Sequence, residues 1–177
     1  MELKVKLLTD TAKLPTKAHD SDAGWDIYAD EDCIIYPGET VKVKTGISVQ
    51  LDGVFNTSHE TIAHLIWDRS SLGSKGIHRL AGCVDFGFSG EILVCLTNLN
   101  VFSVISELRF LNKDSDFYTE ITEALNKNAY KINRGDKIAQ ILTQRVSKVV
   151  ISEGELKETD RGSKGFGSSD AKVQSTL

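Results

Sequence analysis

Short runs of alternating or continuously apolar residues, broken by turn residues, fill most of the first hundred positions. The runs lie at 5–8, 32–36, 40–45, 46–51, 61–67 and 91–98. Many are rich in β-branched residues and are bounded by Gly, Pro or Asp, which is typical of strands joined by turns. A longer β-branched run at 137–150 predicts two strand segments across a bend. Strands of this length and spacing predict an all-β sandwich or barrel.

One segment has a helical rather than a strand pattern. Between Asp114 and Asn128, apolar residues stand at positions 117, 121, 124 and 125, and such a stripe predicts an amphipathic helix. Asp114 or Ser115 would cap its first turn. We therefore expect one short helix, inside an insertion at about 99–133.

The chain from Asp160 onward is rich in Gly and Ser and poor in apolar residues, which predicts a flexible arm. A length of 177 residues is that of a single domain. The expected organisation is one domain at 1–159, which contains the insertion, and a C-terminal arm at 160–177.

Charge and composition exclude several classes of partner. Lys and Arg number 21 and Asp and Glu number 25, so the formal net charge is −4. This balance argues against nucleic acid as the main partner, but it allows a small anion to be bound locally. No apolar run approaches the roughly 20 residues of a membrane span, and the three cysteines indicate reduced core thiols. We therefore expect a cytoplasmic protein that binds neither membranes nor nucleic acids.

Two segments combine cations, hydroxyls and glycines, which are the groups that bind phosphate. They are Asp68–Gly76, which contains Arg69, and Arg161–Ser169. Arginine offers a planar fork of donors, and glycine lets backbone amides approach an anion. Phe166 has no core to join in the second segment, so it predicts stacking on a planar ring. The first segment is equally typical of a polar turn, and composition alone favours a disordered tail for the second.

Three further polar residues stand in apolar surroundings. Asp85 lies at the tip of an expected Gly-bounded hairpin at 82–91, where partial desolvation would suit a base acting on water; an Asx turn is the structural alternative. Phe88 would form the floor of a pocket for a flat ring. Asp26 begins an apolar strand, and Gln140 is an inward-facing polar residue. The histidines have no metal-ligand spacing, so zinc is not expected.

Five segments, in order, resemble the five motifs of the trimeric deoxyuridine triphosphate nucleotidohydrolases (dUTPases). They are 23–27, 69–76, 82–91, 134–141 and 161–169. The resemblance implies a jelly-roll-like β-barrel and a homotrimer with active sites at the subunit interfaces. It also implies hydrolysis of dUTP to dUMP and pyrophosphate by attack of water at the α-phosphorus, with Mg2+ chelated mainly by the triphosphate.

The resemblance also implies a role for each matching residue. Asp85 would activate the attacking water, Phe88 would pack on the deoxyribose, and Asp26 would contact Mg2+ through water. The remaining matches would bind the substrate: Gly82, Cys83 and Val84 at the uracil edge, Arg69, Ser70, Ser71 and Gln140 at the phosphates, Arg161, Gly167, Ser168 and Ser169 at the γ-phosphate, and Phe166 stacked on uracil.

The sequence departs from the usual motifs in three places. Asp68 stands where proline is usual, and Gly87-Phe88-Ser89 stands where Asp-Tyr-Arg is usual. The insertion lengthens the link between the third and fourth motifs. Some bacteriophage members look similar, with an extra segment here that can dock a protein, so a protein partner at the insertion is a further expectation.

Two other functions compete with dUTP hydrolysis. The deoxycytidine triphosphate deaminases share the fold and the Arg-Ser-Ser segment, and their third motif is similar to Asp85–Gly90. Their catalytic glutamate, however, lies ten positions after that aspartate, where this chain has Cys95. The third hypothesis is a regulatory binding protein that keeps the fold and engages a partner through the insertion.

Overall fold

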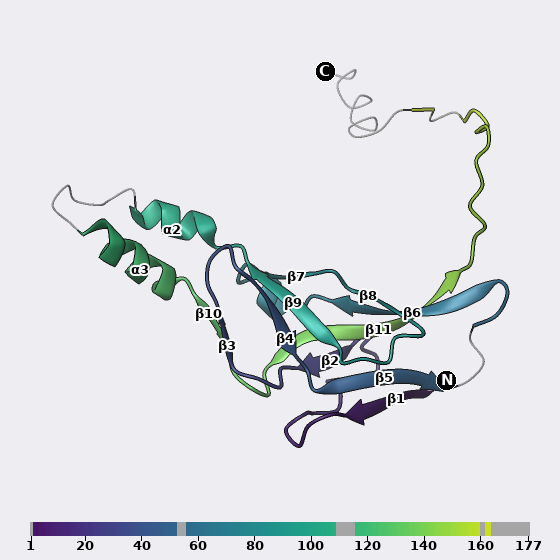
Figure 1. The fold of residues 1–177 in the computed structure, drawn as a ribbon, viewed down its shortest axis with the longest axis horizontal. Helices are drawn as coiled ribbons and strands as arrows, with labels where there is room; N and C mark the ends of the chain where they lie inside the picture. Colours follow the sequence, from purple (N-terminus) through teal and green to yellow (C-terminus); the bar gives the residue numbers. More distant parts are fainter. Residues whose placement is uncertain (1, 53–55, 109–115, 160–161, 164–177) are drawn as a thin grey trace.

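Antiparallel strands form the body of the molecule, and helices lie mainly at one end (Figure 1). The computed structural model describes residues 2–52, 56–108, 116–159 and 162–163. In chain order the elements are β1 (Glu2–Leu7), β2 (Trp25–Tyr28), β3 (Cys33–Ile35), β4 (Thr40–Lys44), β5 (Ile47–Asp52), β6 (Glu60–Trp67), α1 (Ser70–Gly73), β7 (Ile77–Leu80), β8 (Cys83–Asp85), β9 (Leu93–Asn98), α2 (Val101–Leu108), α3 (Phe117–Lys127), β10 (Tyr130–Ile132) and β11 (Lys137–Ser147).

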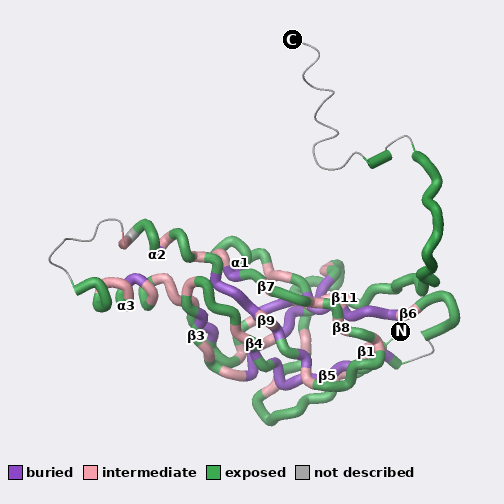
Figure 2. The backbone as a smooth tube through the Cα atoms, turned by 45° about the horizontal axis from the view of Figure 1, so that its top comes forward, coloured by how far each residue is buried: buried purple, intermediate pink, exposed green. Residues whose placement is uncertain are grey.

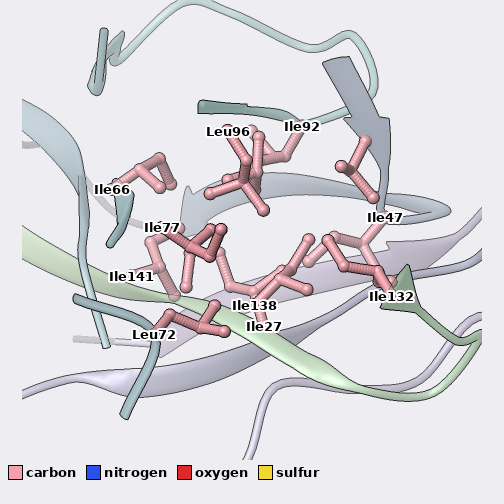
Figure 3. Close-up of a cluster of buried hydrophobic side chains, with 14 of the residues drawn as sticks. Ile27, Ile47, Ile66, Leu72, Ile77, Ile92, Leu96, Ile132, Ile138 and Ile141 are labelled. Carbon is pink, nitrogen blue, oxygen red and sulfur yellow. The ribbon is translucent and has the colours of Figure 1, made fainter. Parts of the chain in front are cut away.

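The strands form four small sheets with a shared core. The largest has the order β2-β11-β6-β8, the next β4-β9-β7, and the others are the pairs β1-β5 and β10-β3. Isoleucine, valine and leucine side chains from these sheets and from α1 meet between them (Figure 3). The all-β class that the strand pattern predicts is confirmed.

The alternation of apolar and polar residues explains β4, whereas β11 is one continuous strand and not the two segments that its sequence predicts. In β4, Val43 is buried and Lys42 and Lys44 are exposed, as expected for a strand with one wet face. The run at 137–150 forms one strand rather than two, because it pairs with β6 without interruption from Gln140 to Ser147. Beyond β11, the described residues up to 159 are exposed and extend away from the body (Figures 1 and 2).

The insertion holds two helices where the sequence analysis expects one. Helix α3 is present, but Asp116, not Asp114 or Ser115, caps it: its side chain accepts a hydrogen bond from the backbone N–H of Tyr118 at 3.2 Å. Helix α2 packs beside α3 (Figure 1). Its apolar residues also stand at helical spacing, at positions 101, 104, 105 and 108. Within the described residues, no helix has the length and apolar character needed to cross a membrane.

The three cysteines are unpaired. Cys33 and Cys95 are half-buried, whereas Cys83 is exposed on β8, at the edge of its sheet. Successive strand residues face opposite sides, and Val84 takes the inward position there. The prediction of core thiols is therefore wrong for Cys83.

The helical part of the insertion is expected to be removable. Ile132 of β10 is buried at 1% exposure, so β10 belongs to the barrel and only residues 101–127 form the separate unit. Replacing residues 101–127 with a short Gly-Ser linker should leave a soluble protein with a Tm close to that of the wild type. Calorimetry and light scattering measure both properties. An insoluble product, or a changed oligomeric mass, would place α2 and α3 in the core or in an interface.

Candidate active site

The buried carboxylate of Asp26, at 5% exposure, joins three segments that lie far apart in the sequence. Its Oδ1 accepts from Arg69 Nε at 3.0 Å and from Gln140 Nε2 at 3.3 Å. Its Oδ2 lies 2.8 Å from Lys137 Nζ. Asp26 thus holds two cations and an amide in one place.

The register of the largest sheet explains this meeting. Gln140 of β11 pairs with Asp26 on one side and with Trp67 on the other. Arg69 follows Trp67 by two residues, and its side chain returns to Asp26. A Cβ at Gly24 would lie 3.0 Å from the Cβ of Gln140, so the absence of a side chain at Gly24 makes room for the glutamine.

The surroundings of Asp26 keep it ionised. Burial alone would raise the pKa of this carboxyl, but the hydrogen bond from Lys137 and the positive charge of Arg69 outweigh burial and hold the pKa below its usual value. The hydrogen bond to Asp26 in turn raises the pKa of Lys137. The cluster therefore carries two cations and one carboxylate at neutral pH.

A hollow of about 390 Å³ opens beside this cluster. Arg69 Nη1 donates to the Lys137 carbonyl at 3.2 Å and to Ser71 Oγ at 3.3 Å, which fixes the guanidinium at the wall. The charged residues of the lining are three cations and one carboxylate: Arg69, Lys75, Lys137 and Asp136. Positive charge is therefore concentrated here although the whole chain has a formal charge of −4. Such a hollow suits a polyanion.

Asp85 has a different setting from the one expected. It ends β8, whose partner is β6 and not the following strand β9, which belongs to another sheet. The predicted hairpin is therefore wrong. Asp85 is exposed in the chain, so the expected desolvation is absent as well.

Phe88 follows Asp85 across a turn. The backbone N–H of Phe88 donates to the Asp85 carbonyl at 3.0 Å. The ring is 46% exposed and lies over Gly90, where a Cβ would approach Phe88 Cζ to 2.7 Å. Gly90 thus leaves room for an aromatic face that is open to solvent.

The chain brings some expected site residues together and leaves others apart. Asp26, Arg69, Ser71 and Gln140 meet at or beside the hollow, and Ser70 is exposed at the start of α1. Asp85 pairs with Ala63, four residues before Trp67 on β6, which is roughly 13 Å along a strand. Gly82, Cys83 and Val84 lie in or beside β8 with Asp85.

Five expected residues cannot be placed against this site. Arg161, Phe166, Gly167, Ser168 and Ser169 lie outside the described residues.

Lys137 is a site residue that the sequence analysis missed. In a regular strand, positions 137 and 140 face opposite sides. The pairing of β11 with β2 shifts register between Lys137 and Ala139, and this irregularity lets both side chains reach Asp26. The shift depends on pairing between distant strands, so alternation alone does not reveal it.

The described residues provide no ready metal cage. Among them, no three His, Cys, Asp or Glu side chains are grouped so that they would hold a metal ion. An ion at this site would therefore need most of its ligands from a bound molecule or from water.

Comparisons with known proteins agree with the motif resemblance. The family model described as dUTPase matches residues 10–107 and 120–170, and its gap falls within the insertion. The deoxyuridine 5'-triphosphate nucleotidohydrolase of Clostridium tetani is 35% identical over 170 residues, covering 94% of each chain. The protein of the same name from Mycolicibacterium gilvum is 36% identical over 176 residues, again covering 94% of each.

Solved structures show the same fold. The Staphylococcus bacteriophage 80alpha dUTPase with dUPNHPP matches with a TM-score of 0.71 and 24% identity, over 94% of this chain and 97% of that one. The dUTPase of phage phi11 of S. aureus, described with a species-specific insert, matches with a TM-score of 0.60 and 24% identity, over 93% and 100%. With a family model that matches most of its length and relatives of 35–36% identity over 94% of it, this chain belongs to the dUTPase family.

Proposed function

We propose that the chain hydrolyses dUTP to dUMP and pyrophosphate, with water attacking the α-phosphorus. The observation that carries the proposal is the cluster around Asp26 with the cationic hollow beside it, because together they gather three of the family motifs into one anion site. The names of the relatives supply the nucleotide: they are deoxyuridine 5'-triphosphate nucleotidohydrolases.

In this proposal, each polar residue of the site has a separate role in binding or catalysis. Arg69 Nε and Nη1 are engaged by Asp26, Ser71 and the Lys137 carbonyl, so Arg69 presents its Nη2 N–H groups to phosphate oxygens. Ser70 and Ser71 donate hydroxyl hydrogen bonds, and Gln140 adds an amide. Asp85 orients the attacking water and accepts its proton. Phe88 packs on the deoxyribose, where a 2′-hydroxyl would meet an apolar ring. The segment from Gly82 to Val84 contacts the uracil edge through its backbone.

Mg2+ is proposed as the cofactor, carried by the substrate. It prefers oxygen ligands, keeps several waters and usually binds through substrate phosphates, which fits a site whose described residues form no metal cage. A phi11 phage dUTPase structure is described with a structural Mg(II) ion. When bound, Mg2+ neutralises charge on the triphosphate. Asp26 already accepts from Arg69 and Lys137, so it would contact a water of the ion rather than the ion itself.

A homotrimer is proposed to complete each site. Within one chain, Asp85 lies apart from Arg69, so a second copy would bring its own Asp85 to the phosphate segment. The exposed apolar side chains beyond β11 also suit contact between copies: they are Val149, Val150, Ile151 and Leu156.

The proposed arm at 160–177 would supply Arg161, Gly167, Ser168 and Ser169 to the γ-phosphate and Phe166 to the base. Residues 1–159 would form the barrel domain.

The insertion is proposed as a protein-docking surface. Phe102 of α2 and Tyr118 of α3 are 80% and 81% exposed, and aromatic side chains of this kind are enriched in protein interfaces. This role would add to catalysis and would not replace it.

The proposed reaction predicts a clear substrate preference. With Mg2+, the protein should convert dUTP to dUMP and pyrophosphate, and it should act on UTP or dTTP at a small fraction of that rate. Chromatographic separation of the products measures all of these reactions. Comparable rates on UTP would contradict the role of Phe88. Conversion of dCTP to dUTP would instead support a deaminase, which Cys95 at the position of the deaminase glutamate argues against.

A further inference from the structure

The phosphate segment lies in a crossover between two sheets. Strands β6 and β8 pair in one sheet, while β7, which lies between them in sequence, pairs with β9 in another. The chain therefore leaves the first sheet after Trp67 and returns to it at Gly82. Arg69, Ser70 and Ser71 all lie in the outgoing crossover, where no strand ladder fixes the backbone.

Asp68 ties this crossover to β7. Its Oδ1 accepts from the backbone N–H of Arg79 at 2.7 Å. Its Oδ2 lies 3.0 Å from His78 Nδ1 and 3.9 Å from Arg79 Nε. The side chain of Asp68 is 26% exposed, so these contacts are partly shielded from water. The Asp68 carboxylate thus links the start of the phosphate segment to His78 and Arg79, two consecutive residues of β7.

Arg79 is itself held firmly. Its guanidinium lies 5.4 Å from the ring centroid of Trp67, and its Nη1 donates to the Ala81 carbonyl at 3.0 Å. The same Nη1 would lie 2.6 Å from a Cβ at Gly82, so Arg79 packs closely on the returning crossover. The backbone N–H that Asp68 binds belongs to β7, where Arg79 pairs with Leu96 of β9. Asp68 therefore bonds to a fixed point of the body.

We propose that Asp68 is a positioning residue that sets the phosphate segment for the triphosphate. Arg69 is held at its guanidinium end by Asp26 and Lys137, and Asp68 holds its backbone end. Leu72 of α1, which is buried in the core, anchors the end of this segment that follows Ser71. Without Asp68, the segment 69–71 would keep its side chains and lose the anchor on the side that precedes Arg69. The inference rests on the proposed function, because it assigns these three residues to phosphate binding.

The expected effect is confined to ligands that carry the phosphate chain. Correct orientation of binding groups is worth large factors, and a misplacement of about 1 Å costs up to about 100-fold. The uracil segment is held mainly by the pairing of β8 with β6 and by a 2.7 Å bond from the Ile66 N–H to the Gly82 carbonyl, neither of which involves Asp68. Loss of Asp68 should therefore weaken triphosphate binding and leave nucleoside binding alone.

Two variants and a control test this. Asp68→Ala removes all three contacts of the carboxylate, and Asp68→Asn keeps an oxygen that accepts from the Arg79 N–H but removes the charge. Glu60→Gln is the control for loss of a charge: Glu60 begins β6, far from Asp68 along the strand, and its carboxylate lies 3.8 Å from Arg145 of β11. Calorimetry with full-length protein and Mg2+ gives the affinities for α,β-imido-dUTP and for deoxyuridine, and steady-state kinetics gives kcat/KM for dUTP.

The expected result for Asp68→Ala is an affinity for α,β-imido-dUTP and a kcat/KM about tenfold lower, with deoxyuridine affinity within twofold of the wild type. For Asp68→Asn, the affinity for α,β-imido-dUTP and kcat/KM should each be about threefold lower. For Glu60→Gln, both should equal the wild-type values. If either Asp68 variant is folded and binds the analogue normally, or if it loses both ligands equally, the proposal is overturned. Should Asp68→Ala not fold, Asp68→Asn decides by the same comparison. A wild-type protein inactive on dUTP would refute the proposed function instead.

Discussion

Replacing Asp85 with asparagine should lower kcat for dUTP by about 10²–10⁴-fold, the range typical of a lost general base. The amide keeps the shape of the side chain and cannot take the proton of the attacking water. Asp85 is exposed at the end of β8, so the change should leave the fold and the binding of α,β-imido-dUTP nearly unchanged. Single-turnover measurements separate the chemical step from binding.

A matched control for Asp85→Asn is Asp52→Asn. Asp52 is also an exposed aspartate at the end of a strand, and its Oδ2 lies 2.7 Å from Lys4 Nζ on the surface. Water screens surface pairs of this kind, so they contribute little to stability, and the control should keep its kcat. If Asp85→Asn retained more than about a third of the wild-type kcat, Asp85 would not be the base.

Replacing Asp26 with alanine should destabilise the protein by about 1–3 kcal/mol, less than the cost of breaking a fully buried ion pair, because Arg69 and Lys137 are 26% and 35% exposed and water screens them in part. Arg69 and Lys137 would lose their shared anion, and the carboxylate that aims Arg69 would be gone. We expect a lower urea midpoint at pH 7 and a large loss of activity on dUTP. An unchanged midpoint would show that the cluster contributes no net stability.

The stability contribution of Asp26 depends on pH with a definite sign. Its pKa in the folded protein lies below the ordinary aspartate value of 3.8, because the hydrogen bond from Lys137 and the charge of Arg69 outweigh the burial that would raise it. The contribution is therefore fully present above pH 3.8 and is lost as the pH falls through the lower folded value. The difference in free energy of unfolding between the wild type and Asp26→Asn should narrow below about pH 4. The pKa of Asp30 is also lowered, because hydrogen bonds from Thr11 and Thr9 outweigh the burial that would raise it. Asp30 remains in both proteins, so its titration cancels, and a difference that stayed constant down to pH 3 would contradict the assignment.

Local sequence patterns predict the positions of strands and helices in this fold better than they predict which strands pair with each other. The alternation at 40–45 predicts β4, and the apolar stripe at 117–125 predicts α3, because both depend on neighbours within a few residues. The pairing of β8 with β6 was not predicted, because a short strand after a turn offers no local sign of its sheet.

For the candidate site too, the sequence predicts the local segments but not the long-range contacts between them. The chemistry of Arg69 and Asp26 is visible in their segments, and the family resemblance supplies the expectation that they act together. Their contact, however, depends on the register of β11 between β2 and β6, which joins residues up to 114 positions apart. Lys137 enters the site only through an irregularity in that register, so no local pattern indicates it.

The two ends of the insertion meet at a single buried amide. Asn98, at 0% exposure, donates from Nδ2 to the Ile35 carbonyl and to the Asn128 carbonyl, both at 2.9 Å. These hydrogen bonds hold the two ends of the insertion together at the barrel, so the segment between them forms a closed loop. Doubling the length of a flexible loop costs only about 0.6 kcal/mol. Segments of very different size can accordingly be exchanged at this point over evolution, or grafted there by design, at little cost to the rest of the molecule.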